Sequence, residues 1–89
     1  MKKLEDYPNI GVGMAAQLKE IGIFTFMQLK QMGSRKVMIR MREYKLKFDL
    51  QTFFRLEACI REIPWYQLTK LERIELKKFY TSLDRHIET

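Results

Sequence analysis

Apolar residues recur at helical spacing along nearly the whole chain, and short breaks divide this pattern into five segments. The first segment covers about Val12–Ile21 and is followed by Gly22, which suits the left-handed position after a helix. Thr25 and Gln28 match a capping box for a second, brief helix that Gly33 ends. No run of alternating β-branched residues exceeds four positions. The sequence therefore predicts an all-α fold.

Three further helices are expected after Gly33. Ser34 is expected to cap a helix that reaches about Tyr44, and Asp49 a helix that ends before Pro64. A second capping box, Thr69 with Glu72, is expected to open the last helix. The apolar side chains expected to face inward are Val37, Met38, Met41 and Tyr44 in the third helix, Leu50, Phe53, Phe54, Ala58 and Ile60 in the fourth, and Leu76, Phe79, Tyr80, Leu83 and Ile87 in the fifth.

The length and composition predict one domain, residues 1–89, located in the cytoplasm. Eighty-nine residues with no linker-like segment suit a single core. The longest apolar-leaning stretch, Ile21–Leu29, is too short to span a bilayer, and the initial Met-Lys-Lys has no apolar export segment behind it. The lone Cys59 suits a reducing compartment and is expected outside the main apolar arc of its helix.

The positive charge is concentrated in one central segment. Of the net charge of +6, all is contributed by Lys30–Lys47, which holds seven basic residues against Glu43; the other ten basic and ten acidic residues cancel. In helical projection these cations fall on one face of the third helix and in the loop after it. Such a surface suits a polyanion or an acidic protein, and the alternative interpretation is a solvated face that maintains solubility.

A glycine-rich turn precedes the first helix. Asn9 and Gly11 tolerate positive φ, Ile10 is expected in the core, and Ala15 allows close helix packing. The backbone amides of Gly11, Val12 and Gly13 would then face outward at a helix start, where phosphate groups bind.

This segment, Pro8-Asn9-Ile10-Gly11-Val12-Gly13 with Ala15 and Leu18, resembles a helix-hairpin-helix unit. In that family the hairpin grips nucleic-acid backbone without reading sequence, often helped by a lysine at the position that is Gly13 here. A structural turn that locks two helices together is the alternative.

The later half resembles a specific family. The hairpin comes first along the chain, followed by the Gly22-Ile23 pair and the Thr25…Leu29 helix. After them come a basic third helix and a Leu56-Glu57-Ala58 helix that ends just before Trp65. In this order the features resemble the C-terminal domain of the TfoX (Sxy) competence regulators, over about Leu4–Leu83. Full-length members carry a separate N-terminal domain, so the chain is expected to be a stand-alone copy. The resemblance implies a regulatory role linked to transcription of DNA-uptake genes.

Two binding functions follow from these features. The first is contact with double-stranded nucleic acid, through six phosphate contacts and a salt slope of about −5. The second is docking of an acidic protein partner on the same surface. The candidate binding residues are Gly11, Val12, Gly13, Arg35, Lys36, Arg40, Arg42 and Lys47. The oligomeric state stays undetermined.

The sequence predicts no enzyme, no cofactor, no metal site and no small-molecule substrate, because no acid, base and nucleophile can be assembled. His86 has no second histidine or nearby cysteine to share a metal. Glu57, inside an apolar arc, is expected to bond a backbone N–H or a basic partner. Trp65 is expected to close the core between two helices. The methionines expected to fill the core are Met14, Met27, Met32, Met38 and Met41.

Overall fold

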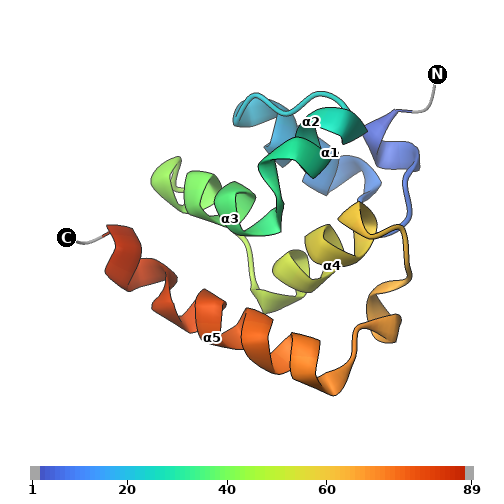
Figure 1. Cartoon of the computed structure of the whole chain (residues 1–89). Helices are drawn as coiled ribbons and strands as arrows, with labels where there is room; N and C mark the ends of the chain where they lie inside the picture. The colour runs from blue at the N-terminus through green and yellow to red at the C-terminus, as the bar shows by residue number, and fades with distance from the viewer. Residues whose placement is uncertain (1–2, 88–89) are drawn as a thin grey trace.

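Five α-helices and two short 3-10 turns make up the fold, and no strand occurs between residues 3 and 87 (Figure 1). This computed structural model describes the backbone of residues 3–87 and the side chains of residues 3–83. The expected all-α class is confirmed. In chain order the elements are η1 Leu4–Asp6, α1 Gly11–Glu20, α2 Phe26–Met32, α3 Ser34–Glu43, α4 Leu50–Ile60, η2 Trp65–Gln67 and α5 Lys70–Ile87.

The helices α3 and α4 form the middle of the molecule (Figure 1). The long helix α5 packs against both of them on one side, and α2 packs against both from the other. The turn η1 packs on α1. An ion pair between Arg61 and Glu72 also joins the end of α4 to the start of α5. Each helix therefore buries an apolar stripe against at least one neighbour.

The predicted caps of α2, α4 and α5 are confirmed. Thr25 Oγ1 accepts a hydrogen bond from the Gln28 amide at 3.1 Å, and Gln28 Oε1 accepts from the Thr25 amide at 3.2 Å. Asp49 Oδ1 caps α4 through the amide of Thr52 at 2.9 Å. In α5, Thr69 and Glu72 form the same reciprocal pair. These bonds satisfy amides that a helix start leaves without intrahelical partners.

The end of α1 is also as predicted. Gly22 has φ +88°, and the Ile23 amide donates to the Leu18 carbonyl at 2.8 Å. This pairing is the Schellman arrangement, in which a left-handed residue lets the chain turn back on the last helical carbonyls.

The cap of α3 was predicted wrongly. Ser34 is the first residue of the helix rather than its cap, and Gly33, with φ +83°, precedes it without a side-chain cap. The Ser34 hydroxyl instead donates to Glu57 Oε1 at 2.6 Å, so it joins α3 to α4.

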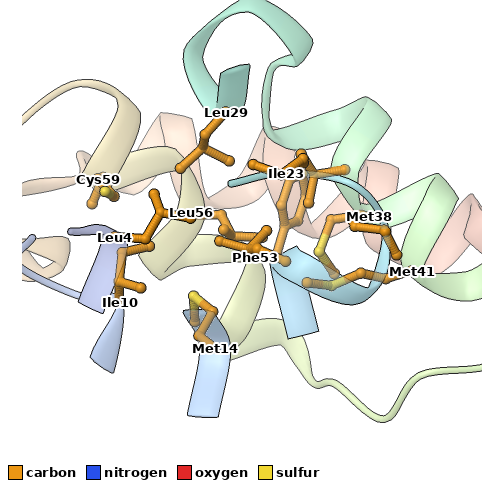
Figure 2. Close-up of a cluster of buried hydrophobic side chains, with 14 of the residues drawn as sticks. Leu4, Ile10, Met14, Ile23, Leu29, Met38, Met41, Phe53, Leu56 and Cys59 are labelled. Atoms are coloured by element: carbon orange, nitrogen blue, oxygen red, sulfur yellow. The ribbon is translucent and has the colours of Figure 1, made fainter. Parts of the chain in front are cut away.

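Side chains from the hairpin, α3 and α4 meet around Phe53, which is fully buried (Figure 2). Phe53 also packs at 5.7 Å, centroid to centroid, against Phe79 of α5. Ile10 is 5% exposed and Ala15 is fully buried, so the hairpin contributes directly to this core. The helix α1 is thereby fixed to the rest of the fold through its apolar side.

Three expected core assignments differ from the structure. Tyr44 is 57% exposed, because it ends α3 where the chain turns at Lys45 with φ +59°. Met27 is 61% exposed on the outer side of α2. Cys59, in contrast, is buried, and it lines a small hollow together with Tyr7 and Pro8 of the hairpin segment. The side chain of Ile87 lies outside the described residues.

The turn expected around Trp65, between the fourth and fifth helices, is present as η2, directly after Pro64. Trp65 is half-buried against the core, and the Arg73 guanidinium lies 5.8 Å from the centre of its ring. Arg73 also donates to the Tyr66 carbonyl at 3.1 Å, which fixes η2 on the first turns of α5. Among the described residues, no helix has the length and apolarity needed to cross a membrane.

Candidate nucleic-acid interface

Two residues with positive φ shape the hairpin turn before α1, and one long-range hydrogen bond anchors it. Asn9 and Gly11 have φ of +77° and +72°, on either side of the buried Ile10. The Asn9 side-chain amide donates to the carbonyl of Ile63 at 3.0 Å, 54 residues further along the chain. Positive φ at two positions gives the tight turn, and the Asn9 bond anchors its tip to the segment after α4.

The first turn of α1 lies open at the surface. Ile10, at the cap position, makes no side-chain cap hydrogen bond. Val12 is 75% exposed, and a Cβ placed on Gly11 or Gly13 would meet no atom within 4 Å outside the local chain. The first-turn amides of an α-helix have no intrahelical acceptors and carry the positive end of the helix dipole. An anion can therefore approach this helix start without displacing a side chain.

Lys47 lies beside α1. The Gln17 side-chain amide donates to the Lys47 carbonyl at 2.5 Å, and the Lys47 side chain is exposed. Gln17 is five residues after Val12, or about 7.5 Å along the helix axis at 1.5 Å per residue. The Lys47 backbone is thus fixed beside α1, between the hairpin and the far end of the helix.

Lys36 and Arg40 lie toward the other end of α1. Arg40 is half-buried, and its guanidinium donates to the Ile21 carbonyl at 3.2 Å. Both cations line a shallow depression with Gly22 and Gln28. Because α1 spans ten residues between Gly11 and Ile21, about 15 Å separate this depression from the hairpin.

Arg35 and Arg42 lie on a different side of α3. The Arg35 guanidinium is 5.8 Å from the Phe79 ring of α5, and that of Arg42 is 4.8 Å from the Phe48 ring. The structure therefore places the hairpin, Lys47, Lys36 and Arg40 along α1, and it turns Arg35 and Arg42 toward α5 and the α3–α4 loop. The single basic face expected from the helical projection divides into two.

Glu57 receives a hydrogen bond from a partner that the sequence did not indicate. The donor is the Ser34 hydroxyl rather than a backbone amide or a basic side chain. Glu57 is half-buried and lines a hollow that also contains Arg35 and Glu72.

The comparison with known proteins identifies the fold family. Residues 1–80 match the model of the TfoX C-terminal domain. The chain belongs to this family. The TfoX C-terminal domain is a regulatory-type domain, in the manner of a competence regulator.

Two solved structures resemble this TfoX C-terminal domain closely. A crystal structure of an uncharacterized protein from Listeria monocytogenes, in a triclinic form, has 34% sequence identity and a TM-score of 0.87, covering 93% of this chain and 94% of that chain. A tetragonal crystal form of a Listeria monocytogenes protein of unknown function has 35% identity and a TM-score of 0.85, covering 90% and 99%. No curated protein sequence matches the chain.

A separate apolar groove lies between η1 and α2 of the TfoX domain. It has a volume of about 650 Å³ and contains Tyr7 stacked on Phe26, with centroids 4.5 Å apart. Phe24 and Met27 line it as well and are more than half exposed. Its charged lining residues are Lys3, Lys19 and Glu5. This groove could not be predicted from the sequence, because Phe24, Phe26 and Met27 are also typical of a core.

No group of three metal-ligating side chains occurs among the residues that the structure describes. The side chain of His86 lies outside them.

Proposed function

We propose that this TfoX C-terminal domain is a non-enzymatic regulatory module that contacts the backbone of double-stranded nucleic acid. The observation that carries the proposal is the open first turn of α1, with Val12 exposed and no side-chain cap at Ile10. Natural helices usually satisfy these amides with a capping side chain, as α2, α4 and α5 do here. A helix start without a capping side chain suits a phosphate oxygen as acceptor.

In this mechanism the hairpin binds one phosphate and the cations along α1 bind others. Amides of residues 11–13 donate to the phosphate oxygens, and Lys47 contributes positive charge nearby. Lys36 and Arg40 reach the backbone about 15 Å away, at the far end of α1. Contacts to phosphate position a protein without reading bases, so the module is expected to bind without strong sequence preference.

The salt dependence expected from the structure is shallower than that expected from the sequence. Of the five cations predicted to bind, three lie along α1, since Arg35 and Arg42 face elsewhere. At roughly 0.9 per phosphate contact, these three cations and the hairpin give a slope of log affinity against log salt of about −3.6, rather than about −5.

Fluorescence anisotropy with a labelled duplex at about 50 and 200 mM salt tests the proposal. Val12→Glu places a carboxylate beside the hairpin amides, where the helix dipole tolerates it. We expect this variant to fold normally and to weaken binding at least about tenfold, by loss of roughly 1.4 kcal/mol or more. Thr81→Glu is the matched control: it makes the same charge change at an exposed position on α5.

Two results would contradict the proposal. One is a duplex affinity that does not change with salt. The other is an equal loss of affinity in Val12→Glu and Thr81→Glu, which would indicate that only the total charge matters.

The second candidate function is docking of an acidic protein partner, and the apolar groove between η1 and α2 favours it. Exposed apolar patches on small domains mark interaction surfaces, and the two lysines of this groove outnumber its single glutamate. Absence of micromolar duplex binding at the lower salt would favour this function over the first.

A further inference from the structure

The depression at the far end of α1 is lined by hydrogen-bond donors. Its volume is about 430 Å³. Among the described residues, those that line it include two cations and no carboxylate: Gly22, Gln28, Gln31, Met32, Lys36 and Arg40. A surface with this lining favours an anion.

Two of these donors are held in place by bonds that the fold already makes. The Arg40 guanidinium is fixed by the Ile21 carbonyl at 3.2 Å, and a guanidinium has five N–H groups, so others remain for a ligand. Gln28 Oε1 accepts from the amides of Phe24 and Thr25 at 2.7 and 3.2 Å. This orientation of the amide leaves its N–H₂ group for acceptors on the other side. Donors that are fixed beforehand lose little conformational entropy on binding.

The start of α3 adds an independent indication. Its first turn contains no acidic residue and no side-chain cap, and the first three residues include Arg35 and Lys36. The helix dipole disfavours cations at this end and favours anions. An anion bound beside Lys36 offsets this unfavourable interaction between the cations and the helix dipole.

The negative end of α1, which also adjoins the depression, is already neutralised. The carbonyls of Leu18 and Lys19 accept from the amides of residues 21–23, and the carbonyl of Ile21 accepts from Arg40. A ligand therefore meets the guanidinium rather than uncompensated carbonyl oxygens.

We infer that this depression is a phosphoryl-group site, formed by Arg40, Lys36 and the side-chain amides of Gln28 and Gln31. A tetrahedral oxyanion accepts from several donors at once, and the residues that line the depression carry guanidinium, ammonium and amide donors. The site lies at the opposite end of α1 from the hairpin, and it rests on the proposed function only in that Lys36 and Arg40 are also the cations proposed to contact nucleic-acid backbone there. The phosphoryl group belongs either to nucleic-acid backbone or to a small phosphorylated molecule.

The test uses inorganic phosphate and the intact ¹⁵N-labelled chain at constant ionic strength. We expect saturable shifts in the side-chain amide signals of Gln28 and Gln31. Lys36→Gln is expected to weaken the apparent affinity for phosphate at least about fivefold. Lys30→Gln, which makes the same charge change at an exposed position on α2 outside the lining, is expected to change it by less than about twofold. Unsaturable shifts, or equal losses in the two variants, overturn the inference.

Gln31→Glu supplies a second test, because it adds a carboxylate to the depression at an exposed position. It is expected to abolish the phosphate response, and retention of that response overturns the inference.

Duplex DNA distinguishes the two sources of the phosphoryl group. Backbone as the source predicts that the duplex competes with phosphate and that Lys36→Gln weakens duplex binding as well. A small phosphorylated molecule as the source predicts saturable phosphate binding that the duplex leaves unchanged. Phosphate binding without any duplex binding contradicts the proposed function alone, whereas duplex binding without a phosphate response contradicts this inference alone.

Discussion

Ser34 and Glu57 form a polar contact between α3 and α4 beside an otherwise apolar core. Ser34 is 3% exposed, and its hydroxyl lies 2.6 Å from Glu57 Oε1. A half-buried carboxylate is costly when it lacks a donor. This hydrogen bond therefore supports the packing of the two helices on each other.

Ser34→Ala is expected to destabilise the domain by about 1–2 kcal/mol, because it leaves Glu57 without this donor. For a domain of this size the melting temperature falls by roughly 4–8 °C per kcal/mol. Thermal unfolding followed by circular dichroism measures the change. Ser82→Ala is the control, since the Ser82 hydroxyl bonds the Phe79 carbonyl within its own helix and is expected to contribute little. Equal melting temperatures for the two variants would show that the Ser34–Glu57 bond adds no stability.

Residues whose role depends on a distant partner were the hardest to predict from sequence. Ser34 matches a cap locally, but its partner Glu57 is 23 residues away. The sequence predicts Arg40 to be a surface cation, whereas its guanidinium donates a hydrogen bond to the Ile21 carbonyl at the end of α1. Cys59 is peripheral in the projection of its own helix, but in the fold it is buried next to the hairpin segment. In each case tertiary packing, which local periodicity does not contain, decides the environment.

At the scale of elements, the short helix α2 depends strongly on its cap. It has seven residues, which is fewer than an isolated helix needs to be stable in water, about 12–15. The Thr25–Gln28 box satisfies its start and also orients the Gln28 amide toward the phosphoryl site. Capping boxes were predicted correctly here because both partners lie within four residues of sequence. The turn at Trp65 was expected from Pro64, whereas the hydrogen bond from Arg73 of the following helix that fixes η2 could not be predicted from local sequence.

Thr25→Ala is expected to cost about 1 kcal/mol through the lost cap. Faster amide hydrogen exchange should be concentrated in α2, and thermal unfolding gives the overall loss. Thr81→Ala serves as the control, since Thr81 is exposed within α5 and its hydroxyl bonds the Lys78 carbonyl of the same helix. The expectation fails if both variants lose the same stability or if exchange in α2 stays unchanged.

At the scale of the whole molecule, one core joins all five helices around Phe53. The buried members come from every α-helix, as Leu18, Leu29, Met38, Leu56 and Leu83 show. Helical periodicity predicted most of this core, because burial follows the apolar stripes. It could not predict how the stripes face one another. For that reason the cations of α3 were expected on a single face of the molecule. They occur on two faces, because α3 is packed between α2 and α5.

Phe53→Ala is expected to cost about 3–5 kcal/mol, because it leaves a cavity in the core. A domain of 89 residues has a total stability of roughly 4–13 kcal/mol, so the variant should be close to unfolding. Phe24→Ala removes the same atoms from a side chain that is 58% exposed, and its cost should stay below about 1 kcal/mol. Urea unfolding of both variants compares them. Similar midpoints would show that Phe53 is not central to the core.

The hydrogen bond between Asn9 and Ile63 has a consequence for the order of folding. It closes a loop of 54 residues, and contacts so distant in sequence form late because the chain entropy lost in closing them is large. The tip of the hairpin should therefore become rigid only after α4 has docked. In native-state amide hydrogen exchange, the protection of this tip and of the Ile63 segment should rise and fall together. Opening of either segment should therefore be measurable as faster exchange in the other.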